Sequence, residues 1–111
     1  MDVFEARTIT LEEFNGEEYD HFGKVAFRQR AALGRRSPGR TFMTLWLEEG
    51  YAVLMLDQDL QAKAIEERPD VFTPHPSKWG ERGSTIIRLE RASEAVFRKW
   101  LGAAVAHAAR K

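Results

Sequence analysis

The sequence predicts an α+β fold, in which helices pack an antiparallel sheet of four to five strands in the element order α-β-β-β-α-β-α. Two apolar runs, residues 41–47 and 51–56, flank the turn sequence Glu48-Glu49-Gly50 and predict a hairpin. A third alternating run, residues 25–31, precedes them and completes a three-stranded meander. A helical apolar pattern near the end of the chain needs a sheet face to bury it.

The first segment, up to about residue 14, contains conflicting signals. Phe4 and Leu11 are seven positions apart, as on one face of a helix, and Thr10 and Glu13 have the spacing of a capping box. The β-branched residues at positions 8–10 favour a strand instead. We expect a short or irregular helix before the turn signal at positions 15–16, Asn-Gly.

The strands of the meander differ in their two faces. Residues 25–31 alternate so that Arg28 and Arg30 share one side, which predicts a strand with one solvated, basic face. Residues 33–40 contain two glycines and a proline and are expected to form a loop. Both faces of the run 41–47 are mostly apolar, which is typical of a central strand. One face has Met43, Leu45 and Leu47, and the other has Phe42, Thr44 and Trp46.

A second helix, a last strand and a third helix follow. Asp57 is a candidate N-cap, and Pro69 predicts that this helix ends near Arg68. Residues 85–90 alternate as a strand, and Ser93 can cap the C-terminal helix. The apolar face of that helix is expected to comprise Phe97, Trp100, Leu101, Ala104, Val105 and Ala108.

Length and composition indicate an ordinary globular protein. A chain of 111 residues is the size of one domain, so residues 1–111 are expected to share one core. There is no cysteine, which excludes a disulfide, a thiolate nucleophile and a cysteine-ligated metal. No apolar run approaches the roughly 20 residues that span a bilayer, and the first residues do not resemble a leader peptide. We expect a cytoplasmic protein with no membrane partner.

Charge is segregated along the chain although 17 basic and 17 acidic residues cancel. Residues 1–20 contain seven acids and one base, and residues 21–47 contain six bases and no acid. Residues 48–70 contain seven acids and two bases, and residues 71–111 contain three acids and eight bases. Such asymmetry indicates either a charged partner or neighbouring blocks that neutralise one another in the fold.

Three segments at the ends of predicted elements are informative: Asp20-His21-Phe22-Gly23-Lys24, Arg68-Pro69-Asp70-Val71-Phe72 and Trp79-Gly80-Glu81-Arg82-Gly83. With these segments, the chain over roughly residues 14–111 resembles the MmcQ/YjbR family of small bacterial proteins. The chain departs from the family at Ser84, where relatives often have tryptophan, and in its longer, more basic loop at 33–40. The resemblance implies a double-wing arrangement similar to certain DNA-binding domains and a fold similar to small secretion chaperones. A shared fold does not by itself specify a function.

The strongest candidate for a functional surface is a group of cations that we call the basic block. Its members are Lys24, Arg28, Arg30, Arg35, Arg36 and Arg40. Lys78 and Arg82 extend it if their loop lies at the same end of the sheet. Guanidinium groups can contact phosphates in pairs of hydrogen bonds, so these eight residues are the predicted nucleic-acid-binding set. The alternative is a solvated basic face that pairs with the acidic residues at positions 12–18.

A second candidate is a small-ligand pocket near His21, His75 and Trp79. His75 lies between two prolines, and Trp79 belongs to a loop rather than to a periodic apolar pattern. The histidines lack the spacing of a metal site, and the chain has no nucleophile elbow and no phosphate-binding glycine motif. We therefore expect no enzyme activity, no cofactor and no metal.

Three functions remain open at this point. The leading hypothesis is a non-enzymatic protein that binds nucleic acid, DNA in particular, through the basic block. The first alternative is a protein-binding or self-associating module that uses an exposed sheet face with Phe42, Thr44 and Trp46. The second alternative is a small-ligand binder, or an enzyme, with its site at the predicted pocket residues.

Overall fold

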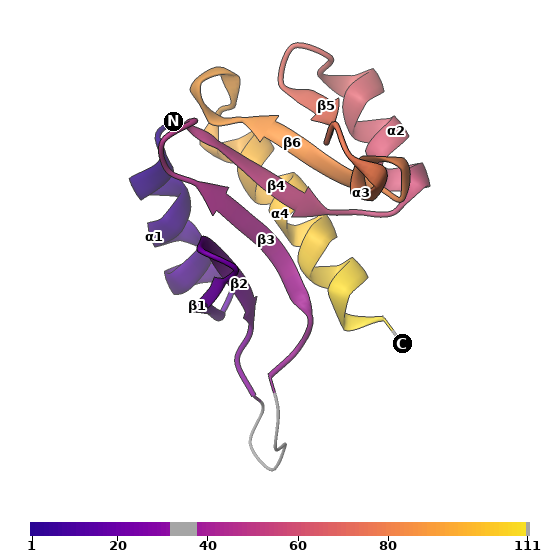
Figure 1. The fold of residues 1–111 in the computed structure, drawn as a ribbon. Helices are drawn as coiled ribbons and strands as arrows, with labels where there is room; N and C mark the ends of the chain where they lie inside the picture. Colours follow the sequence, from indigo (N-terminus) through magenta and orange to yellow (C-terminus); the bar gives the residue numbers. More distant parts are fainter. Residues whose placement is uncertain (32–37, 111) are drawn as a thin grey trace.

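The computed structural model describes residues 1–31 and 38–110, which form a sheet layer and a helix layer (Figure 1). The helices are α1 (Val3–Glu13), α2 (Gln58–Glu67), α3 (Lys78–Glu81) and α4 (Glu94–Ala109), with a short 3-10 helix at Leu89–Arg91. The strands are β1 (Gly16–His21), β2 (Lys24–Gln29), β3 (Thr41–Trp46), β4 (Tyr51–Met55), β5 (Phe72–Pro74) and β6 (Ser84–Arg88). They form an antiparallel sheet in the order β1-β2-β3-β4-β6-β5.

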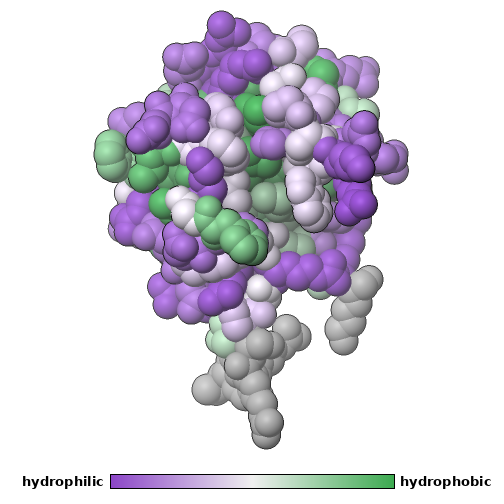
Figure 2. All heavy atoms as spheres, viewed as in Figure 1, coloured by the Kyte–Doolittle hydropathy of each residue, from purple (hydrophilic) through white to green (hydrophobic). Residues whose placement is uncertain are grey.

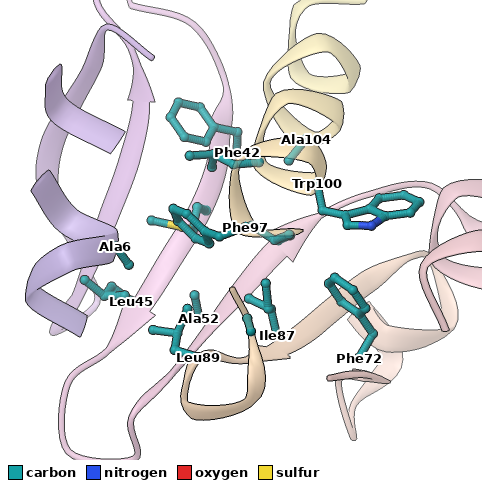
Figure 3. Close-up of a cluster of buried hydrophobic side chains, with 14 of the residues drawn as sticks. Ala6, Phe42, Leu45, Ala52, Phe72, Ile87, Leu89, Phe97, Trp100 and Ala104 are labelled. Atoms are coloured by element: carbon teal, nitrogen blue, oxygen red, sulfur yellow. The ribbon is translucent and has the colours of Figure 1, made fainter. Parts of the chain in front are cut away.

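The three longer helices lie on one side of the sheet. α4 packs against β3 and β4, α1 contacts β1, β3 and α4, and α2 contacts β5. The strands pass in front of α4 in Figure 1. Between the layers lies a cluster of buried apolar side chains in which Phe97 and Trp100 of α4 meet Leu45 and Ile87 of the sheet (Figure 3). The buried members of this cluster are spread along the chain, the first being Val3 in α1 and the last Ala104 in α4.

The opposite side of the sheet, which we call the open face, carries Ala26, Thr44, Val53 and Ile86. Thr44 pairs with Ala26 and with Val53 in neighbouring strands, and Val53 pairs with Ile86. Directly paired residues project from the same face of a sheet. Within the described part of the chain, the one-turn helix α3 and the loops beside it border this face, and no longer helix covers it.

The α+β class is confirmed, but the expected four to five strands and their order are wrong because β1 and β5 were missed. β1 has the sequence Gly-Glu-Glu-Tyr-Asp-His, which lacks apolar alternation. It lies at a sheet edge, where a strand needs less apolar surface than a central strand. β5 forms the other edge and contains only three residues, the last of which is Pro74. Proline is tolerated at an edge because its missing N–H breaks no ladder there.

The first helix is regular and longer than predicted, and it begins at a different cap. The Asp2 carboxylate accepts a hydrogen bond from the Glu5 backbone N–H, and the Glu5 carboxylate accepts one from the Asp2 backbone N–H. The proposed capping box at Thr10 is wrong, because the Thr10 hydroxyl donates to the Ala6 carbonyl oxygen at 2.7 Å inside the helix. Phe4 is exposed, and the buried positions of α1 are Val3, Ala6, Ile9 and Thr10.

A register shift changes the faces predicted for β3. Phe27 pairs with Met43, but the next residue, Arg28, pairs with Thr41, so Phe42 is an extra residue in the ladder. Phe42 is completely buried in the core (Figure 3), and the tip of its ring lies beside Gly16 of β1. The expected contact set of Phe42, Thr44 and Trp46 therefore does not lie on one exposed face.

The other boundaries are close to the predictions. Asp57 caps α2 through the Leu60 N–H, and Ser93 caps α4 through the Val96 N–H. The last strand ends two residues early at Arg88, and the chain then turns through the 3-10 helix. A carboxylate joins two of the helices: Glu67 of α2 accepts a hydrogen bond from the Trp100 indole at 2.7 Å and pairs with Lys99.

Shortening Leu101 to alanine should cost about 2–5 kcal/mol of unfolding free energy, because Leu101 is fully buried between α4 and the sheet. Urea unfolding followed by circular dichroism measures this loss. The control is Val105→Ala on the same helix, which should cost less because Val105 is only half-buried. A Leu101→Ala loss below about 1 kcal/mol would contradict the packing described here.

Candidate ligand pocket on the open sheet face

A pocket of about 350 Å³ lies on the open face. It is lined by His21, Lys24, Thr41, Thr44, Trp46, Val53, Met55, His75, Trp79 and Ser84. Figure 2 shows hydrophobic residues in the middle of this face, with polar and charged residues around them. Small-molecule sites are typically concave, mostly apolar and about 300–1,000 Å³ in volume. The pocket is at the lower end of that range.

The floor of the pocket is made by the central strands. Thr44 of β3 and Val53 of β4 pair directly and are only 8% and 3% exposed. β-Branched residues of this kind pack well on a pleated surface. The Trp46 indole N–H donates to the Thr44 hydroxyl oxygen at 3.1 Å, which holds the indole over its own strand.

Aromatic rings form one wall. Trp46 stacks on Tyr51 of the adjacent strand, with ring centroids 5.4 Å apart and an interplanar angle of 27°. The His75 ring lies 6.0 Å from Trp46 in a tilted arrangement. Burial, and then the charge of Glu49, raise the pKa of the Tyr51 hydroxyl, so Tyr51 stays neutral at neutral pH. Tyr51 therefore supports Trp46 without adding a charge to this wall.

Lys24 brings a positive charge to the pocket. Its Nζ atom lies 3.9 Å from the centroid of the Trp46 ring, a cation–π contact. In the parts of the chain that the structure describes, no carboxylate lies within salt-bridge distance of Lys24. The ammonium group is thus available to an anion that enters the pocket.

The β1–β2 hairpin places His21 at the pocket and exposes Phe22 at its tip. The hairpin turns through Phe22 and Gly23, which both have positive φ angles, 52° and 83°. Positive φ at both central residues is common in two-residue hairpin turns, although a bulky residue is unusual there. Phe22 is also 93% exposed and makes an edge-on contact with His21 at 4.8 Å.

The segment that carries His75 and Trp79 is held by close backbone packing. A Cβ atom at Gly80 would lie 1.7 Å from the His75 carbonyl oxygen, and one at Gly83 would lie 2.1 Å from the Leu56 carbonyl oxygen. Gln61 of α2 donates hydrogen bonds to the carbonyl oxygens of Gly80 and Ser84. These contacts fix the pocket wall against the helix layer.

The structure brings together the three residues predicted from the sequence as a ligand pocket. His21, His75 and Trp79 come from two distant segments and line the same cavity. Trp79 is 63% exposed at the rim, which agrees with its separation from the apolar core pattern. His107, the third histidine, lies outside the pocket, with Nδ1 3.9 Å from the Asp57 carboxylate.

The predicted nucleic-acid-binding residues have several different roles. Arg28 pairs with Glu17 of β1 at 2.8 Å and stacks over the Tyr19 ring, so the charge of this member of the basic block is neutralised within the fold. Arg30 and Arg40 are exposed beside the strand ends, and Lys78 and Arg82 are exposed on either side of Trp79. Arg35 and Arg36 lie outside the described residues.

The described residues contain no group of three histidines, aspartates or glutamates that could hold a metal ion. They also contain no helix that is both long and apolar enough to cross a membrane. No protein-family model, curated protein or solved structure matches this chain. The resemblance to the MmcQ/YjbR family therefore stays a prediction.

Sequence reasoning missed the floor and the charged group of the pocket. Lys24 belongs to the predicted nucleic-acid-binding set, and Trp46 belongs to the exposed sheet face predicted to contact a protein partner. Thr41, Val53, Met55 and Ser84 were not singled out as site residues. Strand alternation could have placed Val53 and Met55 together on one face, but it does not show which face the helices leave open.

Gly80→Ala should destabilise the protein by about 1–3 kcal/mol, because its methyl group would overlap the His75 backbone. Gly102→Ala is the matched control: its Cβ would meet only a Phe14 ring carbon at 3.7 Å, and alanine should stabilise the interior of α4 by up to about 1 kcal/mol. Thermal unfolding measures both effects. Equal melting temperatures for the two variants would contradict the tight packing at Gly80.

Proposed function

We propose that this protein binds a small, planar, largely apolar molecule in the pocket on its open face. The observation that carries this proposal is the 350 Å³ pocket, in which Trp46 and Trp79 surround an apolar floor together with a few polar groups. Aromatic side chains supply much contact area and favour stacked or edge-on contacts with planar ligands. The proposal concerns binding and assigns no reaction to the site.

The arrangement favours a small ligand over a protein partner on this face. Protein interfaces of standard size bury about 800 Å² on each partner and need a broad surface. Phe42, Thr44 and Trp46 were expected to form a surface for a protein partner. Phe42 is buried in the core, and Thr44 and Trp46 line the pocket. Phe22 and Trp79 remain as exposed apolar residues, so self-association is a measurable alternative outcome.

Two aromatic probes, neutral 2-naphthamide and anionic 2-naphthoate, test the pocket by titration followed by amide signals in two-dimensional NMR spectra. Either probe should shift signals of the residues that line the pocket. Met55→Trp fills the cavity from β4 and should weaken binding about tenfold or more. Thr73→Trp is the control, because Thr73 pairs with Ile86 on the same sheet face but does not line the pocket.

Binding of neither probe at millimolar concentration would overturn the proposed function. Equal binding by wild type and Met55→Trp would show that the probes bind elsewhere, and this result would also overturn it. The oligomeric state of the protein without probe is measured in parallel by analytical ultracentrifugation. Dimerisation that Met55→Trp abolishes would assign the open face to a second copy of the chain instead.

A second candidate function is binding of single-stranded nucleic acid at the rim of the pocket. The specific observation is that Trp79 is exposed between two exposed cations, Lys78 and Arg82, with the Arg82 guanidinium 5.4 Å from the Trp79 ring. Proteins that bind single strands combine stacking aromatics with cations that contact the backbone. This candidate retains part of the predicted nucleic-acid-binding set.

Fluorescence anisotropy with a labelled oligothymidylate tests this candidate over a series of salt concentrations. If Lys78 and Arg82 contact phosphates, the double variant Lys78→Glu, Arg82→Glu should reduce the log–log salt slope by about 0.7 for each lost contact. The double variant Arg91→Glu, Arg110→Glu has the same charge change at exposed positions away from the pocket. Absence of binding at low salt, or equal loss in both variants, would exclude a specific site at Trp79.

A further inference from the structure

We propose that the ligand of the pocket is a planar aromatic anion, with its carboxylate or phosphate group at Lys24 and its ring over the floor formed by Thr44, Val53 and Met55. This inference rests on the proposed binding function and adds the chemical class of the ligand. It is drawn from the charges and hydrogen bonds of the lining residues.

Among the described residues that line the pocket, the lysine, arginine, aspartate and glutamate side chains contribute only positive charge. Lys24 is the only lysine or arginine among the described lining residues, and none of these residues is an aspartate or glutamate. The Lys24 ammonium contacts the Trp46 ring and has no carboxylate partner in the described ranges. A cation beside an apolar floor lacks full hydration, so a ligand anion gains a charge-assisted contact there. A cationic ligand would meet repulsion instead.

The hydroxyl groups that line the pocket already have partners. The Thr44 oxygen accepts from the Trp46 indole, and the Ser84 hydroxyl donates to the Met55 sulfur at 3.6 Å. The Thr41 hydroxyl and the Tyr19 hydroxyl share a hydrogen bond. The groups left to donate to a ligand are the Lys24 ammonium, the imidazoles, the Trp79 indole N–H and the Thr44 hydroxyl, whose oxygen only accepts in its bond with Trp46. Donors of this kind favour an anion.

The imidazoles of His21 and His75 are placed where they can contact the anionic group of a ligand. His75 uses Nδ1 in a 2.8 Å hydrogen bond with the Ser77 hydroxyl, which leaves Nε2 for another partner. His21 is held edge-on between the rings of Tyr19 and Phe22, at 5.9 Å and 4.8 Å. Both rings line the cavity that Lys24 enters. An imidazole N–H and an ammonium group can both donate to a carboxylate or phosphate oxygen.

The shape of the pocket favours a flat ring. Trp46 is fixed on one wall by its stack with Tyr51 and its hydrogen bond to Thr44. Trp79 stands at the rim with most of its surface exposed. A flat ligand that reaches from Trp46 toward Trp79 would cover both rings at little conformational cost, since few rotatable bonds must be ordered.

Isothermal titration calorimetry with four probes that share one ring system tests the inference. The probes are 2-naphthoate, 2-naphthyl phosphate, 2-naphthamide and 2-naphthylmethylammonium. Wild-type protein should bind the better of the two anions about tenfold or more tightly than the amide, the scale of one charge-assisted contact. The two anionic probes show whether the site prefers a carboxylate or a phosphate.

Lys24→Met keeps most of the side-chain stem but removes the charge. It should reduce binding of the anions to the level of the amide while binding of the amide changes less than about twofold. Lys78→Met is the matched control, because Lys78 is exposed and does not line the pocket; it should keep the preference for anions. Lys24→Gln is a second variant if Lys24→Met fails to fold.

The outcomes separate the two proposals. If the amide or the ammonium probe binds as tightly as the anions and Met55→Trp still blocks binding, the ligand is not an anion and the pocket function stands. An unchanged preference for anions in Lys24→Met or Lys24→Gln would likewise overturn the role of Lys24. If no probe binds, the pocket function fails and this inference fails with it.

Discussion

The packing of α4 against one face of the sheet is the interaction on which the rest of this structure depends. Phe97, Trp100 and Leu101 project from α4 into a core shared with the central strands. Their burial supplies the largest apolar contribution of any helix here, at roughly 1.5–3 kcal/mol for each large side chain. Because the three longer helices all lie on this side, the described part of the chain leaves the opposite face bordered by only the one-turn helix α3 and the loops beside it.

The open face is covered by its own side chains instead. Trp46 and Tyr51 stack across β3 and β4, and the stem of Lys24 lies against Trp46. Cross-strand aromatic pairs of this kind stabilise a sheet by up to about 1 kcal/mol. They leave a hollow where the floor is made of smaller residues, Thr44 and Val53. The pocket therefore results directly from the one-sided helix layer.

The pocket wall formed by residues 75–83 is tied to the helix layer although it lies on the other side of the sheet. Gln61 reaches from α2 to the carbonyl oxygens of Gly80 and Ser84, and Gly83 packs against the backbone at Leu56. The Trp100 indole in turn binds Glu67 at the other end of α2. Lys99 and then Trp100 hold the pKa of Glu67 below its usual range, so this contact weakens when Glu67 is protonated in acid.

The sequence by itself determined the α+β class, the caps of α2 and α4 and the apolar face of α4, because these depend on local spacing and side-chain chemistry. It also placed His21, His75 and Trp79 in one candidate site. Only the tertiary structure decided that β1 and β5 are strands, since edge strands gain their order from pairing rather than from an apolar pattern. The shift at Phe42 and the pairing of Arg28 with Glu17 likewise depend on neighbours distant in sequence. Lys24 was predicted to lie on a nucleic-acid-binding surface, but in the structure it lies at the apolar pocket. Only the pairing of β2 with β3 brings it over Trp46, and this pairing cannot be read from local sequence.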